Sequence, residues 1–249
     1  MSFTGKVIIV TGASSGIGAA TAIKFAEAGA SVVIVGRNED KLKNVSDKCN
    51  IFGNKHHVVK ADVSVEADAR RIVDETIEKF GKIDVLVNNA GILRLTAITG
   101  GNMLDSFDEI INTNLRAVIH LTTLTAAHLI ASGGNIVNIS SVAGTKVGKG
   151  MTAYGTSKAA LDHFSRGAAL ELAQHGVRVN VISPGPVATD IIENAGLSVE
   201  QFNVNDFKIP LSRISKSEEV ADLVMFVASD KAVGIAGSNY VLDNGMLLQ

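Results

Sequence analysis

A phenol, an ammonium and a hydroxyl are spaced along one segment of the chain in a way that suits proton transfer. Ser141 lies thirteen residues before Tyr154, and Lys158 lies four residues after it. If this segment is helical, Tyr154 and Lys158 share one face, because residues four apart are neighbours there. A nearby ammonium favours the phenolate, so we expect the pKa of Tyr154 to be lowered from about 10 toward neutrality. The pattern predicts general acid–base chemistry at a substrate oxygen, although the same pair also occurs in ordinary amphipathic helices.

A glycine-rich turn near the start of the chain is typical of nucleotide binding. Thr11-Gly-Ala-Ser-Ser-Gly-Ile-Gly18 follows an apolar run and precedes a helical pattern. Glycines let the backbone turn sharply and let a pyrophosphate approach the N–H groups of the helix N-terminus. The spacing differs from the general dinucleotide fingerprint, and a tight turn without a ligand is the alternative interpretation. The candidate cofactor contacts in this turn are Gly12, Ser14, Ser15, Gly16, Ile17 and Gly18.

The end of the second apolar run indicates which dinucleotide is preferred. An acidic residue there holds the ribose 2′-hydroxyl of NAD, whereas an arginine accommodates the 2′-phosphate of NADP. The chain has Val35-Gly-Arg37-Asn38 at this place, and no acid. A planar guanidinium suits a phosphate, so NADP(H) is the preferred cofactor and NAD(H) the alternative. Ser15 does not supply a second basic residue, and Arg37 could also be an exposed, solvated side chain.

The elements that must position these residues alternate regularly. The predicted strands are Lys6–Thr11, Ser31–Gly36, His56–Ala61, Ile83–Asn88, Gly134–Ser140, Val177–Ser183 and a short one near Asn239–Leu242. The predicted helices are Ile17–Ala28, Glu39–Cys49, Val65–Phe80, Met103–Ala131, Thr152–His175 and Ser217–Ala228. Because the strands are apolar on both faces, helices should cover both sides. The fold class is therefore α/β, a single-domain Rossmann-type doubly wound parallel sheet of about seven strands.

Composition narrows the class of protein. The 249 residues carry a net charge of −2 and no run of lysines or arginines, which gives no electrostatic case for nucleic acid or a membrane surface. Cys49 is the only cysteine, and the six histidines match no metal or nucleophilic pattern, so no metal site is predicted. The N-terminus lacks an apolar signal core, and no apolar stretch approaches about 18 residues. We expect one domain over residues 1–249, located in the cytoplasm.

Taken together, these motifs resemble those of the short-chain dehydrogenase/reductase family, in its short single-domain branch. The resemblance runs from Lys6 to Gly245, and within the family it is greatest to animal members that are like 3-oxoacyl-carrier-protein reductases. Its motifs are Thr11-Gly-x-x-x-Gly-x-Gly18, Asn88-Asn-Ala-Gly91, Asn114, Ser141, Tyr154-x-x-x-Lys158 and Pro184-Gly185.

The resemblance implies a role for each matching catalytic residue. Tyr154 would be the general acid/base, and Lys158 would bind the nicotinamide ribose and lower the pKa of Tyr154. Ser141, rather than Ser140, would stabilise charge that develops on the substrate oxygen. Asn114 would hold a water that continues a proton relay from Lys158 to solvent.

The same resemblance assigns further cofactor contacts. Asp62 and Val63 would contact the adenine, and the segment from Asn88 through Ala90 to Gly91 would line the adenine ribose. Pro184, Gly185, Val187 and Thr189 would position the nicotinamide. A substrate lid is expected at about residues 186–215, because this irregular stretch is longer than an ordinary connection. The chain departs from the family at Ser183, Ser212, Ile214 and Asn244, which leaves lid shape and subunit packing open.

The predicted reaction is hydride transfer between the nicotinamide and a carbonyl or secondary alcohol, with reduction expected because NADP(H) is usually kept reduced. Apolar candidates for the pocket wall favour an acyl, isoprenoid or steroid-like ketone; they are Leu93, Leu95, Val147, Met151, Ile191, Ile192 and Phe202. Arg94, Lys146 and Lys149 could attract an acidic acyl carrier, although solvated surface residues are the stronger interpretation.

Three other functions remain open: an NAD-dependent alcohol dehydrogenase on the same site, a non-enzymatic NADP(H)-binding sensor, and a nucleotide-sugar epimerase or dehydratase. The intact Ser/Tyr/Lys set argues against the sensor. The length and the phosphate turn argue against the epimerase. The resemblance also implies a homotetramer, with helices Met103–Ala131 and Thr152–His175 at one interface and Ser217–Ala228 with the last strand at the other.

Overall fold

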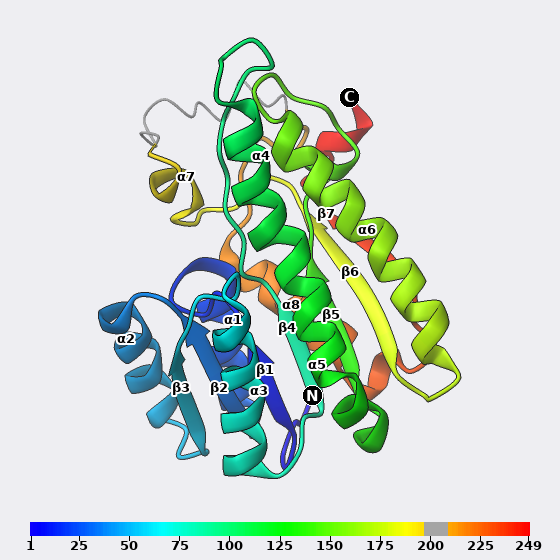
Figure 1. Cartoon of the computed structure of the whole chain (residues 1–249). Helices are drawn as coiled ribbons and strands as arrows, with labels where there is room; N and C mark the ends of the chain where they lie inside the picture. The colour runs from blue at the N-terminus through cyan, green and yellow to red at the C-terminus, as the bar shows by residue number, and fades with distance from the viewer. Residues whose placement is uncertain (197–208) are drawn as a thin grey trace.

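Apolar residues on both faces of seven short strands build one parallel sheet with helices on each side (Figure 1). The computed structural model describes residues 1–196 and 209–249. The strands are β1 (Val7–Val10), β2 (Ser31–Gly36), β3 (His56–Lys60), β4 (Val85–Asn88), β5 (Asn135–Ile139), β6 (Arg178–Pro184) and β7 (Asn239–Leu242). Their order across the sheet is β3-β2-β1-β4-β5-β6-β7. The doubly wound α/β fold predicted from the sequence is confirmed.

All six neighbouring strand pairs are parallel, so the carboxyl ends of the strands lie along one edge. The strand order reverses between β1 and β4, and in open sheets of this kind ligands bind at the carboxyl edge beside such a reversal. Register at this point pairs Ile9 with both Val33 and Leu86, and all three side chains are fully buried. The site should therefore be sought at the carboxyl ends of β1 and β4.

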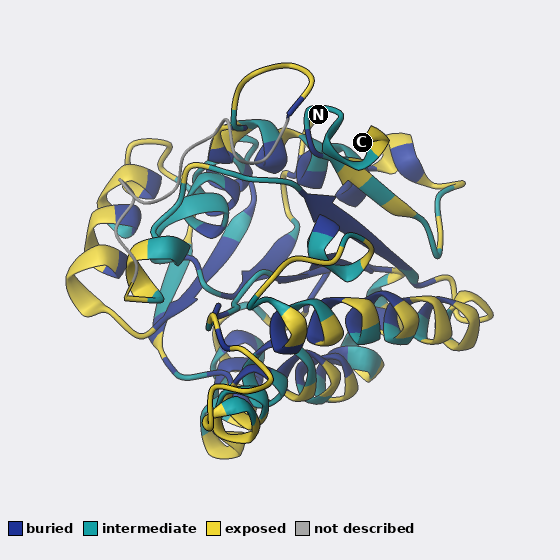
Figure 2. Cartoon of the chain, turned by 90° about the horizontal axis from the view of Figure 1, so that it is seen from above, coloured by how far each residue is buried: buried dark blue, intermediate teal, exposed yellow. Residues whose placement is uncertain are grey.

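Two helical layers cover the sheet (Figure 2). One core cluster joins one face of the sheet to α1 (Gly16–Glu27), α2 (Glu39–Asn50) and α8 (Ser217–Ala228). A second cluster joins the other face to α3 (Glu66–Phe80), α5 (Ala117–Ser132) and α6 (Thr152–Ala173). The five central strands, β2, β1, β4, β5 and β6, are buried along most of their length, whereas the edge strands β3 and β7 are partly exposed. Burial on both faces explains why the central strands consist so largely of Val and Ile.

The longest predicted helix, Met103–Ala131, contains a break that the sequence did not indicate. It consists of α4 (Met103–Ile111), a π-helical turn at Asn112–Arg116 and α5 (Ala117–Ser132). A π-turn accommodates an extra residue and often marks a functional position. The run Met103–Ser132 is also long and apolar enough, by length and composition, to cross a membrane, contrary to the sequence expectation. In this fold it covers the sheet and packs against α3 and α6.

The predicted lid contains one short helix within the described residues, α7 (Ile191–Asn194). The two ends of the predicted lid lie side by side, because Val187 and Ser215 form an isolated parallel β-bridge. There, Ser215 N–H donates to Pro186 O at 3.0 Å. Phe202 and the rest of residues 197–208 lie outside the described part of the chain.

Two of the departures from the family pattern coincide with unusual backbone. Ser212 and Asn244 are the two non-glycine residues with positive φ in the described chain, at 54° and 55°. The left-handed region disfavours side chains other than glycine, and asparagine is better tolerated there than serine. Asn244 Nδ2 also donates to Arg213 O and Ser215 Oγ, at 3.2 and 2.9 Å. These bonds help to hold Asn244 in a conformation that otherwise favours glycine.

Candidate active site

The candidate catalytic residues come together at the carboxyl edge of the sheet, although they are far apart in the sequence. Ser141 lies two residues after the end of β5, and Tyr154 and Lys158 lie in the first two turns of α6. Asn114 lies in the π-turn between α4 and α5. Of these, Tyr154, Lys158 and Asn114 are buried, at 8%, 4% and 0% exposure.

Tyr154 has a raised pKa in the protein, not the lowered value expected from the sequence. Burial disfavours the phenolate and raises the pKa of Tyr154 above 10.0, while the nearby Ser141 hydroxyl lowers it. The Lys158 ammonium lies 5.7 Å from the centre of the Tyr154 ring. Spacing along a helix correctly placed the cation beside the phenol, but it did not reveal how strongly burial opposes the phenolate.

Lys158 is the buried cation of the site. Its Nζ donates to Ile139 O at 2.9 Å, where β5 ends. Burial lowers the pKa of Lys158 from 10.5 to about 8, and the charge of Asp162 partly opposes this change. At neutral pH the ammonium therefore remains mostly protonated, yet it releases its proton more readily than a surface lysine.

Ser141 and its neighbour Ser140 have different environments. Ser141 Oγ accepts from Ala143 N–H at 3.1 Å and remains partly exposed beside Tyr154. Ser140 is 3% exposed, and its hydroxyl donates to Lys158 O at 3.3 Å. Counting back from Tyr154 thus selected the serine that lies closer to the open side of the site.

The Asn114 side chain is occupied by three hydrogen bonds. Its Oδ1 accepts from Ile92 N–H at 2.8 Å, and its Nδ2 donates to Ile92 O at 3.0 Å and to Ser157 Oγ at 3.2 Å. Both hydrogens of the amide are therefore used. Asn114 fixes the irregular segment after β4 against α6. A water held at this residue would therefore need its main chain or the second lone pair of Oδ1.

The glycine turn forms a cradle that side chains would fill. Gly12 and Gly16 have φ of +63° and +54°, which favours glycine. A Cβ at Gly18 would lie 2.3 Å from Gly12 O, and one at Gly16 would lie 2.9 Å from Thr189 Cγ2. Ser15 is the N-cap of α1 but makes no side-chain capping bond there. The close backbone approach and the uncapped N-terminus of α1 fit a dinucleotide pyrophosphate.

Asn89 stabilises this cradle, and the sequence predictions did not single it out. Its Nδ2 donates to Thr11 O at 2.9 Å and to Gly12 O at 3.1 Å. Its N–H and that of Ala90 both donate to Thr11 Oγ1, at 3.0 and 3.1 Å. The Asn-Asn pair at the end of β4 was the available signal: Asn88 binds Asn138 Oδ1 at 2.9 Å within the sheet, and Asn89 holds the turn.

Arg37 lies at the end of β2, where its side chain is 67% exposed and its Nη1 is 3.4 Å from Asp62 Oδ2. Burial raises the pKa of Asp62, but hydrogen bonds from Ser64 and the charge of Arg37 outweigh it and hold that pKa below its usual value. Val63 is buried in the second core cluster. The structure thus brings two predicted contacts together, Arg37 and Asp62, as an exposed ion pair beside the cradle.

The predicted nicotinamide segment follows β6 and returns over the cradle. A Cβ at Gly185 would lie 2.9 Å from Asp243 Cα, so glycine is needed for this close approach. Pro184 ends β6 and is buried, and Val187 makes the bridge to Ser215. Thr189 reaches Gly16 through its methyl group. All four predicted residues of this segment therefore lie in the described chain, near the carboxyl edge.

An apolar cluster lies around Tyr154. It combines residues from α4, α6, α7 and the segment after β4; they are Ile92, Leu93, Met103, Phe107, Ile110, Ala143, Met151, Ala153, Tyr154, Ile191, Ile192 and Ala195. Of the predicted wall residues, four belong to this cluster: Leu93, Met151, Ile191 and Ile192. Leu95 and Val147 do not, and they are 41% and 95% exposed.

Two of the three candidate cations at the mouth are engaged within the chain. Arg94 makes two hydrogen bonds to Glu109, at 3.0 and 2.6 Å. Lys146 Nζ donates to Met246 O and Gln249 O, at 3.0 and 2.7 Å.

Among the described residues, no group of three or more His, Cys, Asp or Glu is arranged to hold a metal ion.

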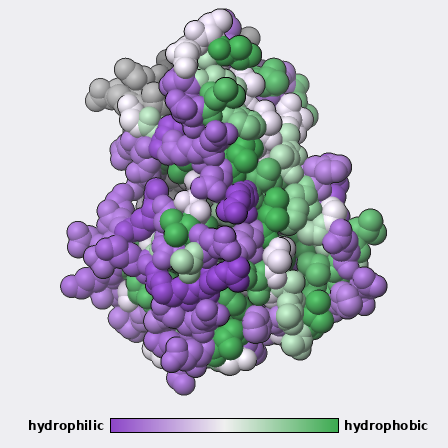
Figure 3. Space-filling model, in the orientation of Figure 1, coloured by the Kyte–Doolittle hydropathy of each residue, from purple (hydrophilic) through white to green (hydrophobic). Residues whose placement is uncertain are grey.

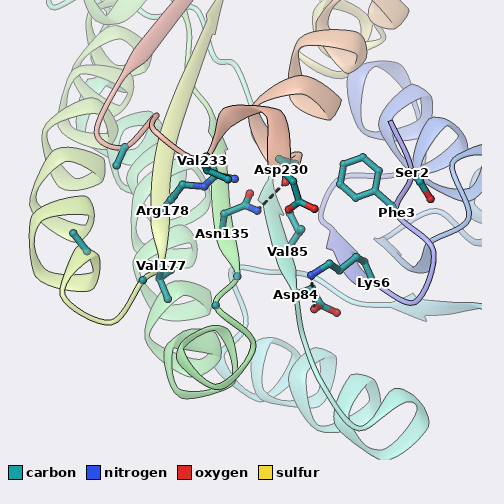
Figure 4. Close-up of a pocket in the computed structure, with 16 residues that line it drawn as sticks. Ser2, Phe3, Lys6, Asp84, Val85, Asn135, Val177, Arg178, Asp230 and Val233 are labelled. Carbon is teal, nitrogen blue, oxygen red and sulfur yellow. Dashed lines mark hydrogen bonds and ion pairs between the residues drawn. The ribbon is translucent and has the colours of Figure 1, made fainter.

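A separate cavity of about 330 Å³ opens at the amino ends of the strands, away from Tyr154 (Figure 4). Asp84 there accepts from Val7 N–H at 2.8 Å and lies 3.4 Å from Lys6 Nζ. Arg178 and Asn135 donate to Val227 O and Ala228 O, at 2.9 and 3.0 Å. These bonds hold the strand starts and the end of α8, so the charged groups of this cavity serve the fold.

Comparison with known proteins shows which proteins this chain is similar to. The sequence profile of a family described as enoyl-(acyl carrier protein) reductase matches residues 12–247. The chain is 34% identical, over the full length of both proteins, to the 3-oxoacyl-[acyl-carrier-protein] reductase FabG of Thermotoga maritima.

Solved structures of related proteins resemble this chain over nearly its whole length. A short-chain dehydrogenase from Burkholderia cenocepacia in complex with NADP has a TM-score of 0.92 and 34% identity, and the match covers 99% of this chain and 100% of that one. A 7α-hydroxysteroid dehydrogenase complexed with NADH and 7-oxo glycochenodeoxycholic acid has a TM-score of 0.91 and 32% identity, covering 98% and 95%.

Proposed function

The chain belongs to the short-chain dehydrogenase/reductase family of oxidoreductases, and we propose that it is an NADP(H)-dependent member that reduces an apolar ketone. The observation that carries this proposal is the position of Tyr154. Its phenol is buried beside Lys158 and Ser141, under an apolar cluster and at the same sheet edge as the glycine cradle. When bound, the nicotinamide supplies the hydride.

Tyr154 delivers a proton to the substrate oxygen as the carbonyl is reduced. Because burial raises the pKa of Tyr154, the phenol is protonated at neutral pH, which is the form needed for a general acid. Ser141, partly exposed beside it, donates a hydrogen bond to the same oxygen and stabilises its developing charge. Lys158 binds the nicotinamide ribose, and its positive charge makes proton release from Tyr154 easier once the site is filled.

The cofactor contacts follow the path of the cradle. The pyrophosphate is surrounded by the glycine turn, that is by Gly12, Ser14, Ser15, Gly16, Ile17 and Gly18. The adenosine side is lined by Asp62, Val63, Asn88, Ala90 and Gly91. The nicotinamide side is lined by Pro184, Gly185, Val187 and Thr189.

Asn114 fixes Ile92 and Ser157 near Lys158, and it acts in the proton relay through a water at its main chain.

Arg37 selects NADP(H) by binding the 2′-phosphate. A guanidinium at the end of β2 attracts a phosphate, and the Burkholderia relative binds NADP. The second candidate is an NAD-dependent alcohol dehydrogenase on the same site. It is favoured by the pairing of Arg37 with Asp62 and by the NADH bound to the hydroxysteroid dehydrogenase.

The apolar cluster around Tyr154 favours a ketone on an acyl, isoprenoid or steroid-like body over a sugar. Ile191 and Ile192 of α7 close this cluster from the lid side, and excluding water there strengthens the interactions of Tyr154 with a substrate oxygen. The engagement of Arg94 and Lys146 within the chain gives little support to docking of an acidic acyl carrier.

The protein assembles as a homotetramer in the cytoplasm. Apolar side chains gather over α5 on the face seen in Figure 3. Ile119 and Ile130 of α5 are each 37% exposed, and Leu170 of α6 is 81% exposed. Burying this face against a second copy would remove apolar surface from water, as at subunit interfaces.

A cofactor and substrate screen tests the proposal. Purified protein is assayed for oxidation of NADPH and of NADH with a panel of ketones that vary from sugars to steroid-like bodies, and in reverse with the matching alcohols. We expect turnover with NADPH and apolar ketones. Turnover only with NADH would support the alternative, and a Tyr154→Phe variant as active as the wild type would refute the assigned proton donor.

A further inference from the structure

Lys41 of α2 forms an ion pair with Asp190, close to the phosphate turn. Lys41 lies in the first turn of α2, where its N–H donates to the capping Asn38 Oδ1 at 3.0 Å. Its Nζ reaches Asp190, the residue directly before α7. The two side chains are 45% and 32% exposed, so the pair is open to solvent. An ion pair this exposed contributes little stability and can be displaced by a stronger anion.

The pair borders a second cavity of about 330 Å³ that includes the phosphate turn itself. Ser14, Ser15 and Gly16 line this cavity together with Lys41 and Asp190. Ser14 also lies beside the end of β2, because a Cβ at Gly36 would be 3.3 Å from its Oγ. The cavity therefore includes the N-terminus of α1, and its Ser14 borders the end of β2, where a ribose 2′-substituent is expected, although Arg37 itself does not line the cavity.

The proposed preference for NADP(H) leaves a charge to be balanced. A 2′-phosphate carries nearly two negative charges at neutral pH. Arg37 is the only cation assigned to it, and that guanidinium is 67% exposed and shared with Asp62. Ser15 adds a hydroxyl but no charge. Two lysines, Lys41 and Lys48, line the cavity that includes Ser14 and Ser15, and Lys41 is the one in the first turn of α2, four residues after Arg37.

We propose that Lys41 is a second cation for the 2′-phosphate and that Asp190 competes with the phosphate for it. Before NADP(H) binds, the carboxylate of Asp190 holds Lys41, as Asp62 holds Arg37. The dianionic phosphate attracts each cation more strongly than a single carboxylate does. This inference rests on the proposed binding of NADP(H) and adds two specificity residues to it, Lys41 in favour and Asp190 against.

Binding titrations test this without relying on turnover. The full-length protein is titrated with NADPH and NADH by calorimetry, in the wild type and in Lys41→Met, Asp190→Asn and the double variant. Lys43→Met is the matched control, because Lys43 is on the same helix and exposed but does not line the cavity. Adenosine 2′,5′-bisphosphate and AMP serve as fragments that differ only in the 2′-phosphate.

We expect Lys41→Met to weaken NADPH and bisphosphate binding roughly tenfold and to leave NADH and AMP binding nearly unchanged. Asp190→Asn should tighten NADPH binding, and this gain should shrink when Lys41 is absent. The salt dependence of NADPH binding should also fall in Lys41→Met. If wild type prefers NADPH but Lys41→Met behaves like Lys43→Met, the inference is wrong and NADP(H) preference stands. If wild type prefers NADH, the proposed cofactor preference fails, and the inference with it.

Discussion

Replacing Lys158 by methionine should change how the stability of the protein depends on pH. Burial lowers the pKa of Lys158 from 10.5 in an exposed side chain to about 8 in the folded protein. Between these two values the unfolded chain holds a proton that the folded chain has released, so unfolding takes up protons. The free energy of unfolding contributed by Lys158 therefore rises with pH across the window from about 8 to 10.5.

The size of this effect follows from the pKa difference. At about 1.4 kcal/mol per pKa unit, the protonated lysine destabilises the folded state by roughly 3 kcal/mol at low pH. Roughly 1 kcal/mol of this is recovered between about pH 7 and pH 9. Cys49 acts in the opposite direction, because burial raises the pKa of its thiol from 9.0 to about 11 and its contribution falls as pH rises. Since Cys49 is present in both proteins, its effect cancels in the comparison.

The assay is urea unfolding followed by circular dichroism, at one protein concentration, for wild type and Lys158→Met between about pH 7 and pH 9. The difference in unfolding free energy between the two proteins should shift by roughly 1 kcal/mol in favour of the wild type as the pH rises. If the difference stays constant with pH, Lys158 titrates as an exposed lysine does, and the account of its burial is wrong.

Three further predictions concern the cradle, the backbone and the buried amide. Gly18→Ala places a Cβ 2.3 Å from Gly12 O and should reduce NADPH affinity at least tenfold in a fluorescence titration; unchanged affinity would contradict the cradle. Ser212→Gly removes a side chain at φ of 54° and should raise the free energy of unfolding by about 1 kcal/mol. Asn244→Gly also relieves a positive φ but loses two hydrogen bonds, so it should not raise the free energy of unfolding. Equal effects of the two substitutions would refute the strain argument. Asn114→Leu leaves the buried N–H and C=O of Ile92 without partners. At roughly 1–3 kcal/mol for each group, the free energy of unfolding measured in urea should fall by about 2–6 kcal/mol. An unchanged urea midpoint would contradict this structural role of Asn114.

Most elements of the fold could be predicted from sequence because each is encoded locally. Ser31–Gly36, Asn239–Leu242 and Ser217–Ala228 have the predicted bounds, and the other strands differ by one or two residues at their ends. Both faces of the sheet are buried, so an apolar run is a direct signal of a strand. The break at Asn112–Arg116 was not predicted, because one π-turn adds a single residue within a run whose composition is helical throughout.

For the site, sequence spacing predicted which residues meet but not their energetics. Lys158 lies beside Tyr154 because residues four apart in a helix share one face, and that prediction needs helix geometry alone. The direction of the Tyr154 pKa shift depends on burial by α4, α7 and the segment after β4, which lie far away in the sequence. The pairing of Lys41 with Asp190 could not be predicted from local sequence either, because 149 residues separate the two.

The central claim, reduction of a ketone with a proton from Tyr154, is tested most directly by a labelled single turnover. Protein is mixed with NADPH that carries deuterium at the transferable position of nicotinamide C4 and with the best ketone of the panel, and the alcohol is analysed by mass spectrometry. We predict one deuterium on the carbinol carbon with wild type, and none with Tyr154→Phe, which should still bind NADPH. Alcohol formed without deuterium on that carbon, or labelled alcohol formed equally fast by Tyr154→Phe, would contradict the account.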